Sequence, residues 1–375
     1  MRWECALLVL LLPHLALADA ARVVVPITQV TLPNGDIRYS VPVRVGESQP
    51  FPALLDTGST GLRVFRTLIP AAFYNDTNLT SVSAFSAGDQ LEGTVGEAPV
   101  AVGDALTNGA VPFELVDRAT CLESRPRCGA MMLTPHDYGI GGDGIAGQGF
   151  QAILGIGLGN VRDSVNPLMH MGDRRWVIEL PEPGTGNTGQ LIINPTAGDV
   201  RDAESFQLNP QPGGWFDTLP GCLVNRATTQ QICGPAILDT GSPGMIAFVP
   251  NAPETTLWRP GEAASLSFTS AANASVTIPF TVDQAAGTGL LQQPATDGEA
   301  SLLSGFLPFF YNDVLYDGAH GTIALAPRPD APNPATAVAA QTNAASAIEV
   351  IEMNAPGSLP QPAANGMPVV ITPTN

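Results

Sequence analysis

The chain of 375 residues contains no lysine, and its Lys and Arg total of 16 consists of arginine alone. A P-loop for nucleotide binding and a catalytic lysine Schiff base both need a lysine, so the sequence excludes these two kinds of chemistry. Acidic residues number 34, and the formal net charge is −18 at pH 7. This charge repels phosphate, and the sequence has no arginine-rich stripe with interleaved aromatic residues. Nucleic acid is therefore not an expected partner.

Long apolar runs are missing as well. The most apolar segment, Ala6 to Leu17, follows Arg2 and is succeeded by small residues up to Ala20. A membrane anchor is the alternative interpretation, but the run is too short to cross a bilayer and Pro13 interrupts it. The pattern is typical of a secretory signal peptide, predicted here as residues 1–20. We therefore expect a secreted protein, extracellular or periplasmic, with no membrane span.

Cysteine is scarce, and one of the five cysteines, Cys5, lies in the predicted signal peptide. The remaining four are an even number, as expected for disulfides in an oxidising compartment. Among three possible pairings we favour the local one, Cys121 with Cys128 and Cys222 with Cys233, which closes one short loop in each half. The cysteine spacing and the scattered histidines do not match a metal site, so no metal and no cofactor are expected.

Apolar patterns of helical period are also absent. Short β-branched stretches such as Val41 to Val45 and Ala98 to Val102 are separated by turn residues, which is typical of an all-β protein with few and short helices. The length favours two domains, predicted as residues 21–180 and 181–327. A hairpin with a long loop, from Trp176 to Asn194, marks the boundary. Residues 328–375, rich in Pro, Ala, Asn and Thr, are predicted to be a disordered tail.

The sequence contains two copies of one short motif. Leu54 to Ser59 reads Leu-Leu-Asp-Thr-Gly-Ser, and Ile237 to Ser242 reads Ile-Leu-Asp-Thr-Gly-Ser. Each copy places an aspartate directly after an apolar strand, then a threonine, a glycine that suits a tight turn, and a hydroxyl. Two ordinary Asx turns are the alternative, but the matching flanks count against it. The copies predict a paired-aspartate active site formed by Asp56 and Asp239, with one loop in each domain.

With these motifs the chain resembles the pepsin-like aspartic proteases. The resemblance covers roughly residues 22–327 and implies a mostly β, bilobal fold, in which two six-stranded-barrel-like lobes flank a cleft. Ile153 to Gly157 resembles the element that crosses behind the first catalytic loop, although Gly144 to Gly147 could also fill that place. Leu302 to Phe306 resembles the second-lobe partner of this element. Val41 to Leu55 and Gly321 to Pro327 resemble the strands that lead into the first loop and close the fold.

The resemblance implies an aspartic endopeptidase, a hydrolase that cleaves polypeptide substrates and works as a monomer. Two close carboxyls share one proton over a range of acidic pH, as they do in pepsin itself. One carboxyl can then take a proton from water while the other donates to the scissile carbonyl. The resemblance assigns the loop residues supporting roles: Thr57 and Thr240 cross-link the loops, Ser59 and Ser242 hold the outer carboxylate oxygens, and Gly58 and Gly241 let the backbones approach.

Two departures from the family pattern concern the flap, the hairpin that covers the substrate. The family usually has an aromatic residue after its first motif, and Arg63 occupies that position here. The flap should lie near Ala84 to Val95 but contains no tyrosine, and its candidate residues are Phe85, Asp89 and Leu91. The departures fit either a different flap that still closes over the substrate or a noncatalytic pepsin-like binding or inhibitor protein. A third alternative is a small-molecule or glycan hydrolase that uses the same two carboxyls, because carboxyl pairs also cleave glycosides at a wider separation.

Overall fold

The regular secondary structure is mostly β-strand, as the short β-branched stretches predict. The computed structural model describes residues 20–331, apart from residues 34, 135, 143, 182–187, 272–274, 284, 296–297 and 330. It contains 49% strand and 7% helix. Among the described residues the α-helical segment is α1 (Leu307–Tyr311), which confirms the prediction of few and short helices. The predicted signal peptide and tail lie almost wholly outside the described residues.

The largest sheet has 15 strands and curls through the molecule. Thirteen of them form one path, in the order β13 (Glu204–Gln207), β25 (Thr322–Pro327), β24 (Asn312–Asp317), β11 (Arg175–Glu179), β12 (Gly189–Ile193), β1 (Val23–Thr31), β2 (Ile37–Val45), β3 (Phe51–Asp56), β10 (Ala152–Ile156), β4 (Thr60–Phe65), β9 (Val111–Cys121), β6 (Asp89–Ala98) and β5 (Asn75–Ala84). The other two are β7 (Val100–Val102), which pairs with β2, and β8 (Ala105–Leu106).

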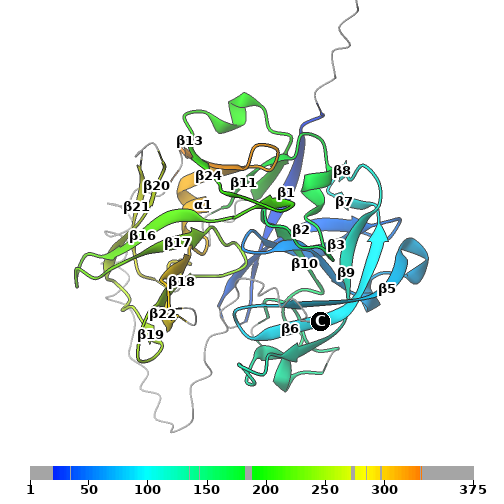
Figure 1. Ribbon diagram of the computed structural model, residues 1–375, viewed down its shortest axis with the longest axis horizontal. Coiled ribbons are helices and arrows are strands. Elements are labelled where there is room, and N and C mark those ends of the chain that lie inside the picture. The colour runs from blue at the N-terminus through cyan, green and yellow to red at the C-terminus, as the bar shows by residue number, and fades with distance from the viewer. Residues whose placement is uncertain are drawn as a thin grey trace, which may run out of the picture.

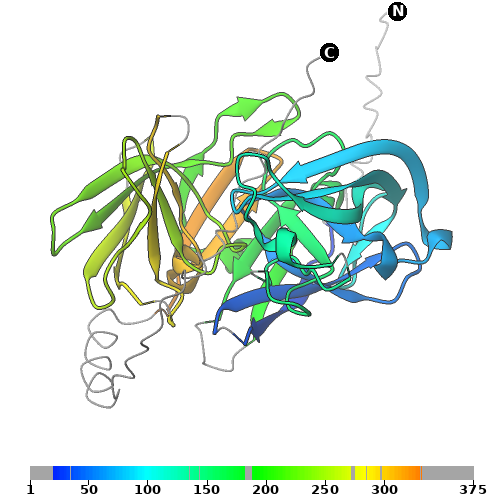
Figure 2. The same cartoon turned by 90° about the horizontal axis from the view of Figure 1, so that it is seen from below.

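A second sheet of eight strands is built from the later part of the chain. Its order is β19 (Thr256–Leu257), β22 (Leu290–Pro294), β18 (Met245–Val249), β23 (Ser301–Leu303), β17 (Gln231–Ile237), β16 (Leu219–Asn225), β20 (Ala263–Thr269) and β21 (Ser275–Thr281). A small ribbon joins β14 (Pro210–Gln211) to β15 (Gly214–Trp215). In Figures 1 and 2 the eight-stranded sheet lies on one side of the molecule and strands β2 to β10 lie on the other, with β24 and β11 between them.

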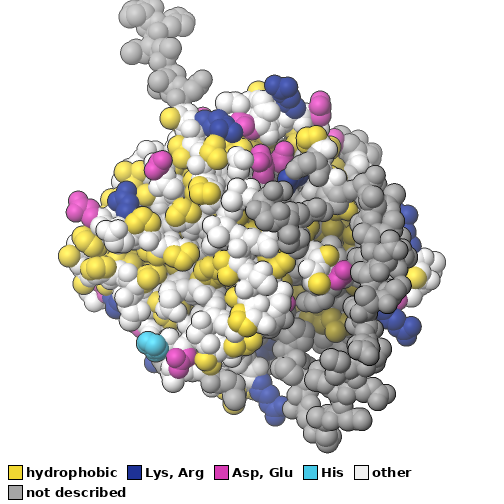
Figure 3. Space-filling view, turned by 180° about the vertical axis from the view of Figure 1, so that it is seen from behind, with side chains coloured by type: hydrophobic (Ala, Val, Ile, Leu, Met, Phe, Trp, Pro, Cys, Tyr) yellow, Lys and Arg dark blue, Asp and Glu magenta, His cyan; other side chains and the backbone are white. Residues whose placement is uncertain are grey.

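Short 3-10 helices connect the strands. They are η1 (Arg66–Leu68), η2 (Ala71–Phe73), η3 (Gly129–Met132), η4 (Pro167–His170) and η5 (Ala197–Val200). No helix in the described part of the chain is long and apolar enough to cross a membrane. On the face drawn in Figure 3, the arginine side chains are scattered and do not gather into one patch.

The same three-strand arrangement occurs in both large sheets. In the first, β10 lies between β3 and β4, parallel to β3 and antiparallel to β4. In the second, β23 lies between β17 and β18, parallel to β17 and antiparallel to β18. Of the two open alternatives for the first crossing element, residues 153–157 overlap strand β10, whereas Gly144 to Gly147 is a loop. The second element, predicted at residues 302–306, overlaps β23. Each predicted aspartate motif therefore forms the loop that connects the two outer strands of its trio, β3 to β4 in the first sheet and β17 to β18 in the second.

The predicted hairpin near residue 180 is confirmed by the pairing of β11 with β12, in which Trp176 faces Ile193. Strand β24, from the end of the described chain, adds to the other edge of β11. The predicted domain boundary therefore falls within a sheet that combines strands from both halves of the sequence.

Aromatic contacts extend one apolar core across both large sheets. Trp176 stacks on Tyr316 with ring centroids 5.8 Å apart, Tyr39 of β2 meets Phe306 edge-on at 4.9 Å, and Phe206 of β13 meets Phe268 of β20 at 6.4 Å. Such pairs add roughly 0.5–1.5 kcal/mol each beyond the area they bury. The core therefore fixes the second sheet against the first.

Both predicted disulfides are present. Cys121–Cys128 closes a loop at the end of β9, with Cα atoms 5.5 Å apart. Cys222–Cys233 joins directly opposed residues of β16 and β17, with Cα atoms 4.1 Å apart. The second bridge braces the strand that leads to Asp239.

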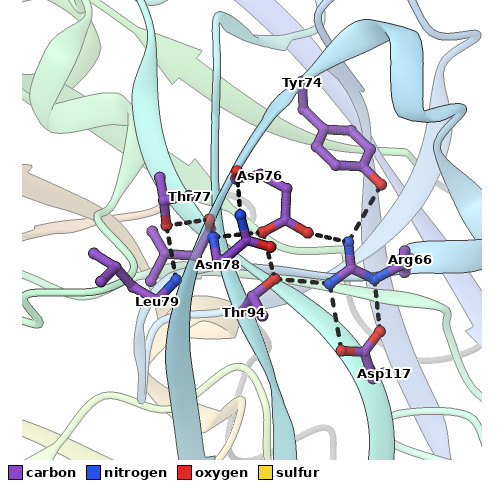
Figure 4. Close-up of polar contacts among 9 residues, drawn as sticks. Arg66, Tyr74, Asp76, Thr77, Asn78, Leu79, Thr94 and Asp117 are labelled. Atoms are coloured by element: carbon purple, nitrogen blue, oxygen red, sulfur yellow. Dashed lines mark hydrogen bonds and ion pairs between the residues drawn. The ribbon is translucent and has the colours of Figure 1, made fainter.

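The predicted hairpin near Ala84 to Val95 is formed by β5 and β6. Its base is fixed by Arg66, whose Nη1 donates to Asp76 Oδ2 at 2.6 Å and whose Nε donates to Asp117 Oδ1 at 2.6 Å. Figure 4 shows this guanidinium joining the hairpin to β9, with Thr94 as a third acceptor. The contacts span the irregular register between Asp76 and Thr80. The base of the hairpin is therefore pinned, and its other end reaches toward the first aspartate loop.

Candidate active site

The two Asp-Thr-Gly loops meet and are joined through their threonines. Thr57 N donates to Thr240 Oγ1 at 3.1 Å, and Thr240 N donates to Thr57 Oγ1 at 2.9 Å. Each hydroxyl in turn donates to a carbonyl of the opposite loop, Thr57 to Leu238 at 2.7 Å and Thr240 to Leu55 at 2.8 Å. These are the hydrogen bonds that the predicted cross-link requires. The repeated strand trio places both loops where this near-symmetric pairing can form.

The glycines of the motifs let each loop approach the opposite aspartate. A Cβ atom on Gly58 would lie 2.4 Å from Asp239 Oδ1, and one on Gly241 would lie 2.7 Å from Asp56 Oδ1. Both distances are shorter than real Cβ atoms tolerate. Each glycine N–H also donates at 2.8 Å to the aspartate of its own loop. Any side chain at Gly58 or Gly241 would therefore push the two carboxyls apart.

The carboxyl groups of Asp56 and Asp239 are buried, with exposed fractions of 5% and 0%. They lie close together, because a Cβ atom on Gly241 would be 2.7 Å from Asp56 Oδ1 and 3.1 Å from Asp239 Oδ1, and each affects the pKa of the other. Ser59 donates its hydroxyl to Asp56 Oδ2 at 2.5 Å, in the predicted role. Ser242 does not take the equivalent role, because its hydroxyl donates to the Gly244 carbonyl at 2.8 Å. The predicted role of the Ser242 hydroxyl is therefore wrong, although the Ser242 backbone N–H lies close enough to the Asp239 carboxyl to lower its pKa. Asp239 thus lacks the hydroxyl donor that Ser59 gives Asp56.

The groups around the two carboxyls affect their pKa values differently. Burial raises the pKa of Asp56, while the Ser59 hydroxyl, the Gly58 N–H and the charge of Arg63 oppose the increase. Burial raises the pKa of Asp239 well above its usual value, and the negative charge of Asp56 raises it further. Two such carboxyls hold one proton between them. The proton therefore belongs to the pair of carboxyls, and the pKa of each is raised.

A small pocket opens beside Asp56. Its volume is about 20 Å³, which holds about one water molecule and no substrate side chain. It is lined by Leu54, Asp56, Phe85, Asp89, Tyr138, Ile140, Gly141, Ile153 and Gly241. Of the three flap candidates, Phe85 and Asp89 reach this pocket. Leu91 does not line it and is fully buried in the apolar cluster under the hairpin.

The carboxyl of Asp89 connects two segments of the backbone. Its Oδ1 accepts the Ala130 N–H at 2.9 Å, and burial raises the pKa of its carboxyl. The bond ties the start of β6 to η3, close to the Cys121–Cys128 bridge. Asp89 therefore anchors the tip of the hairpin to the loop that follows β9.

Arg63 is buried in place of the expected aromatic residue, and its charge is paired. Its Nε lies 3.3 Å from Glu114 Oε2 and donates to Ser83 Oγ at 2.8 Å. Its guanidinium carbon lies 5.5 Å from the centroid of the Phe85 ring. Glu114 and Ser83 were not predicted. The available signal was an arginine inside a buried strand, which requires an acidic partner, and Glu114 is the acidic residue within the apolar run Val111 to Val116.

A third carboxyl, Asp217, lies behind the loops and was also missed. Its Oδ2 accepts the Leu158 N–H at 2.7 Å, two residues beyond the end of β10. Burial raises its pKa to about 7. The pKa of Tyr316 is raised mainly because its hydroxyl is buried, and the negative charge of Asp217 raises it further. The Tyr316 hydroxyl is close to Thr57. The sequence offers no signal for Asp217, because its partners lie far away along the chain.

No group of three or more His, Cys, Asp or Glu side chains that could hold a metal ion occurs among residues 20–331 as described. No protein-family model matches the chain, and a search of curated proteins finds no match. The functional assignment therefore rests on the site itself.

Proposed function

We propose that the chain is a secreted aspartic endopeptidase with a bilobal pepsin-like fold. In this proposal the lobes are residues 21–180 and 181–327, and the substrate cleft lies between them over the two Asp-Thr-Gly loops. The repetition of one strand trio around each motif supports two related lobes. Two disulfides are compatible with an extracellular location.

The observation that carries the proposal is the pair of buried, neighbouring carboxyls, each of which affects the pKa of the other, on two cross-linked loops. Ionised Asp56 would accept a proton from a water molecule as the water oxygen attacks the scissile carbonyl carbon. Protonated Asp239 would donate its proton to the carbonyl oxygen, giving a tetrahedral diol. Asp56 would then pass its proton to the amide nitrogen while Asp239 takes a proton back from a diol hydroxyl, so that the C–N bond breaks, the carbonyl re-forms as a carboxylic acid, and no covalent enzyme adduct occurs.

The closeness of the carboxyls argues against a glycan hydrolase. Glycosidase carboxyls flank the scissile bond at separations of about 5 Å or more, which leaves room for a sugar ring. The Asp56 and Asp239 carboxyls affect each other's pKa and each abuts the glycine of the opposite loop, which favours a spacing too small for a sugar ring. Peptide hydrolysis by an activated water fits this spacing.

A noncatalytic pepsin-like binding or inhibitor protein is the second candidate. The observation that favours it is the small size of the pocket beside Asp56, about 20 Å³, together with Arg63 and Phe85 in place of the family's aromatic pair. For catalysis, the hairpin must open to admit a peptide. For a binding protein, it can stay closed.

A cleavage assay separates the two candidates. The chain without its predicted signal peptide, residues 21–375, is incubated with an unfolded protein substrate from about pH 2.5 to 7. Parallel samples contain a statine inhibitor, which mimics the tetrahedral intermediate. Acid-range cleavage that the inhibitor blocks supports the endopeptidase. No cleavage at any pH by a folded sample would support the binding protein.

A further inference from the structure

The guanidinium of Arg63 contacts three strands at once. Arg63 itself lies on β4, its Nε donates to Ser83 Oγ of β5 at 2.8 Å, and it pairs with Glu114 of β9 at 3.3 Å. Ser83 also donates to Glu114 Oε2 at 2.7 Å. These contacts form a buried triad of Arg63, Ser83 and Glu114. The triad lies beneath the β5–β6 hairpin, near its tip.

The orientation of the Arg63 side chain is fixed by the rest of its donors. Nη1 donates to the Gly61 carbonyl and Nη2 to the Thr60 carbonyl, each at 3.2 Å. The residue is 1% exposed, and a buried cation is stable only when it is paired and hydrogen-bonded. Because Thr60 and Gly61 directly follow the first aspartate loop, the same guanidinium contacts the loop's exit and the hairpin.

The triad also connects to the pocket. Phe85 follows Ser83 by two residues, its ring lies 5.5 Å from the guanidinium carbon, and it lines the pocket beside Asp56. Ring and guanidinium at this distance attract each other. Arg63 therefore contacts Phe85, which lines the pocket beside Asp56, although the Arg63 side chain does not line this pocket itself.

We propose that Arg63 is a positioning residue, which holds Phe85 and the hairpin tip closed over the pocket beside Asp56 through Ser83 and Glu114. The inference deepens the proposed endopeptidase, and its catalytic consequence rests on that function. The tip has further anchors, from Arg125 to the Ser86 carbonyl and from Ala130 to Asp89. Loss of the triad should therefore loosen the tip without unfolding the hairpin.

Arg63 has a second effect on the site, through its charge. The groups that face the Asp56 carboxyl are Asp239 from the second loop, Ser59 and the Gly58 N–H from its own loop, and Arg63 from β4. Asp89 of β6 lines the same pocket. Arg63 supplies the positive charge that favours ionised Asp56. Removing this charge should move the acidic limb of the cleavage profile to higher pH.

The test compares hydrogen exchange at residues 84–91 in three variants. The first, Arg63→Met with Glu114→Gln, removes both charges so that neither is left buried alone. The second, Ser83→Ala, keeps the ion pair and cuts the link to β5. The control, Arg118→Met, removes an exposed arginine that pairs with Glu92 on the outside of the same hairpin.

Exchange at residues 84–91 should become about tenfold faster or more in both triad variants, because a hydrogen bond to a charged group is lost. The control should match the wild type. The KM for a peptide should change in both triad variants, while the acidic limb of the pH profile should shift in the first variant alone. Exchange that stays at the wild-type rate in both triad variants would overturn the proposal. If the wild type cleaves nothing, the proposed function fails, and the exchange rates still test the role of Arg63.

Discussion

Replacement of Asp217 by Asn should change how the stability of the protein depends on pH. The Asp217 carboxyl accepts the Leu158 N–H through Oδ2 at 2.7 Å, and an asparagine oxygen can accept the same bond. Burial raises the pKa of Asp217 from 3.8 to about 7. Between these values the folded state keeps a proton that the unfolded state has released. Stability contributed by this site is therefore present at low pH and is lost as the pH rises through about 7.

The size of the effect follows from the shift in pKa. A shift from 3.8 to about 7 corresponds to as much as about 4 kcal/mol, at 1.36 kcal/mol for each pKa unit. Because Asp217 is partly exposed by surface area, solvent reduces this figure, and about 1–3 kcal/mol is the expected range. At pH 4 the protonated carboxyl and the amide should be nearly equivalent.

The assay is urea unfolding of the wild type and of Asp217→Asn between pH 4 and 8. The wild type should lose stability relative to the variant as the pH rises. Asp56, Asp239 and Glu114 also have pKa values raised by burial, but both proteins share them, so they cancel in the difference. Asp104→Asn, at an exposed site, is the matched control. Parallel curves for wild type and Asp217→Asn would refute the assigned burial of this carboxyl.

Two further predictions concern the loops and the disulfides. Gly58→Ala should abolish cleavage and lower the melting temperature, because its Cβ would lie 2.4 Å from Asp239 Oδ1, whereas Gly198→Ala meets no atom closer than 3.5 Å and should preserve activity. Calorimetry and the cleavage assay check both variants, and an active Gly58→Ala would contradict the close approach of the loops. Replacing Cys222 and Cys233 by serine opens a bridge of sequence separation 11 and should cost about 2–3 kcal/mol in urea unfolding; an unchanged midpoint would contradict the pairing.

The repeated parts of the fold could be predicted because their signals are local. Each aspartate motif carries its own strand, turn and hydroxyl, and the crossing strands at Ile153 and Leu302 are short apolar runs next to glycine or serine. The two disulfides follow from the short spacing of their cysteines. In all these cases the neighbours in sequence are also neighbours in the structure.

The missed features depend on how one loop turns and on contacts between residues that are far apart in the sequence. Ser242 bonds to Gly244 because of how the second loop turns, which the motif itself does not specify. Asp217 bonds to Leu158, 59 residues away. Glu114 pairs with Arg63 only because β4 and β9 are adjacent and parallel. An arginine inside a buried strand indicates that an acidic partner is needed, but only the strand order shows that this partner is Glu114 and that Ser83 joins the pair.

The most direct test of the central claim is the rate of peptide cleavage at acidic pH by Asp56→Asn and Asp239→Asn, each compared with the wild type and with the exposed-site variant Asp104→Asn. Circular dichroism and melting curves establish that each variant is folded. We predict that either loop variant loses cleavage while it stays folded, and that Asp104→Asn cleaves at the wild-type rate. Retained cleavage in folded Asp56→Asn or Asp239→Asn would contradict the assignment of these two carboxyls as the catalytic pair.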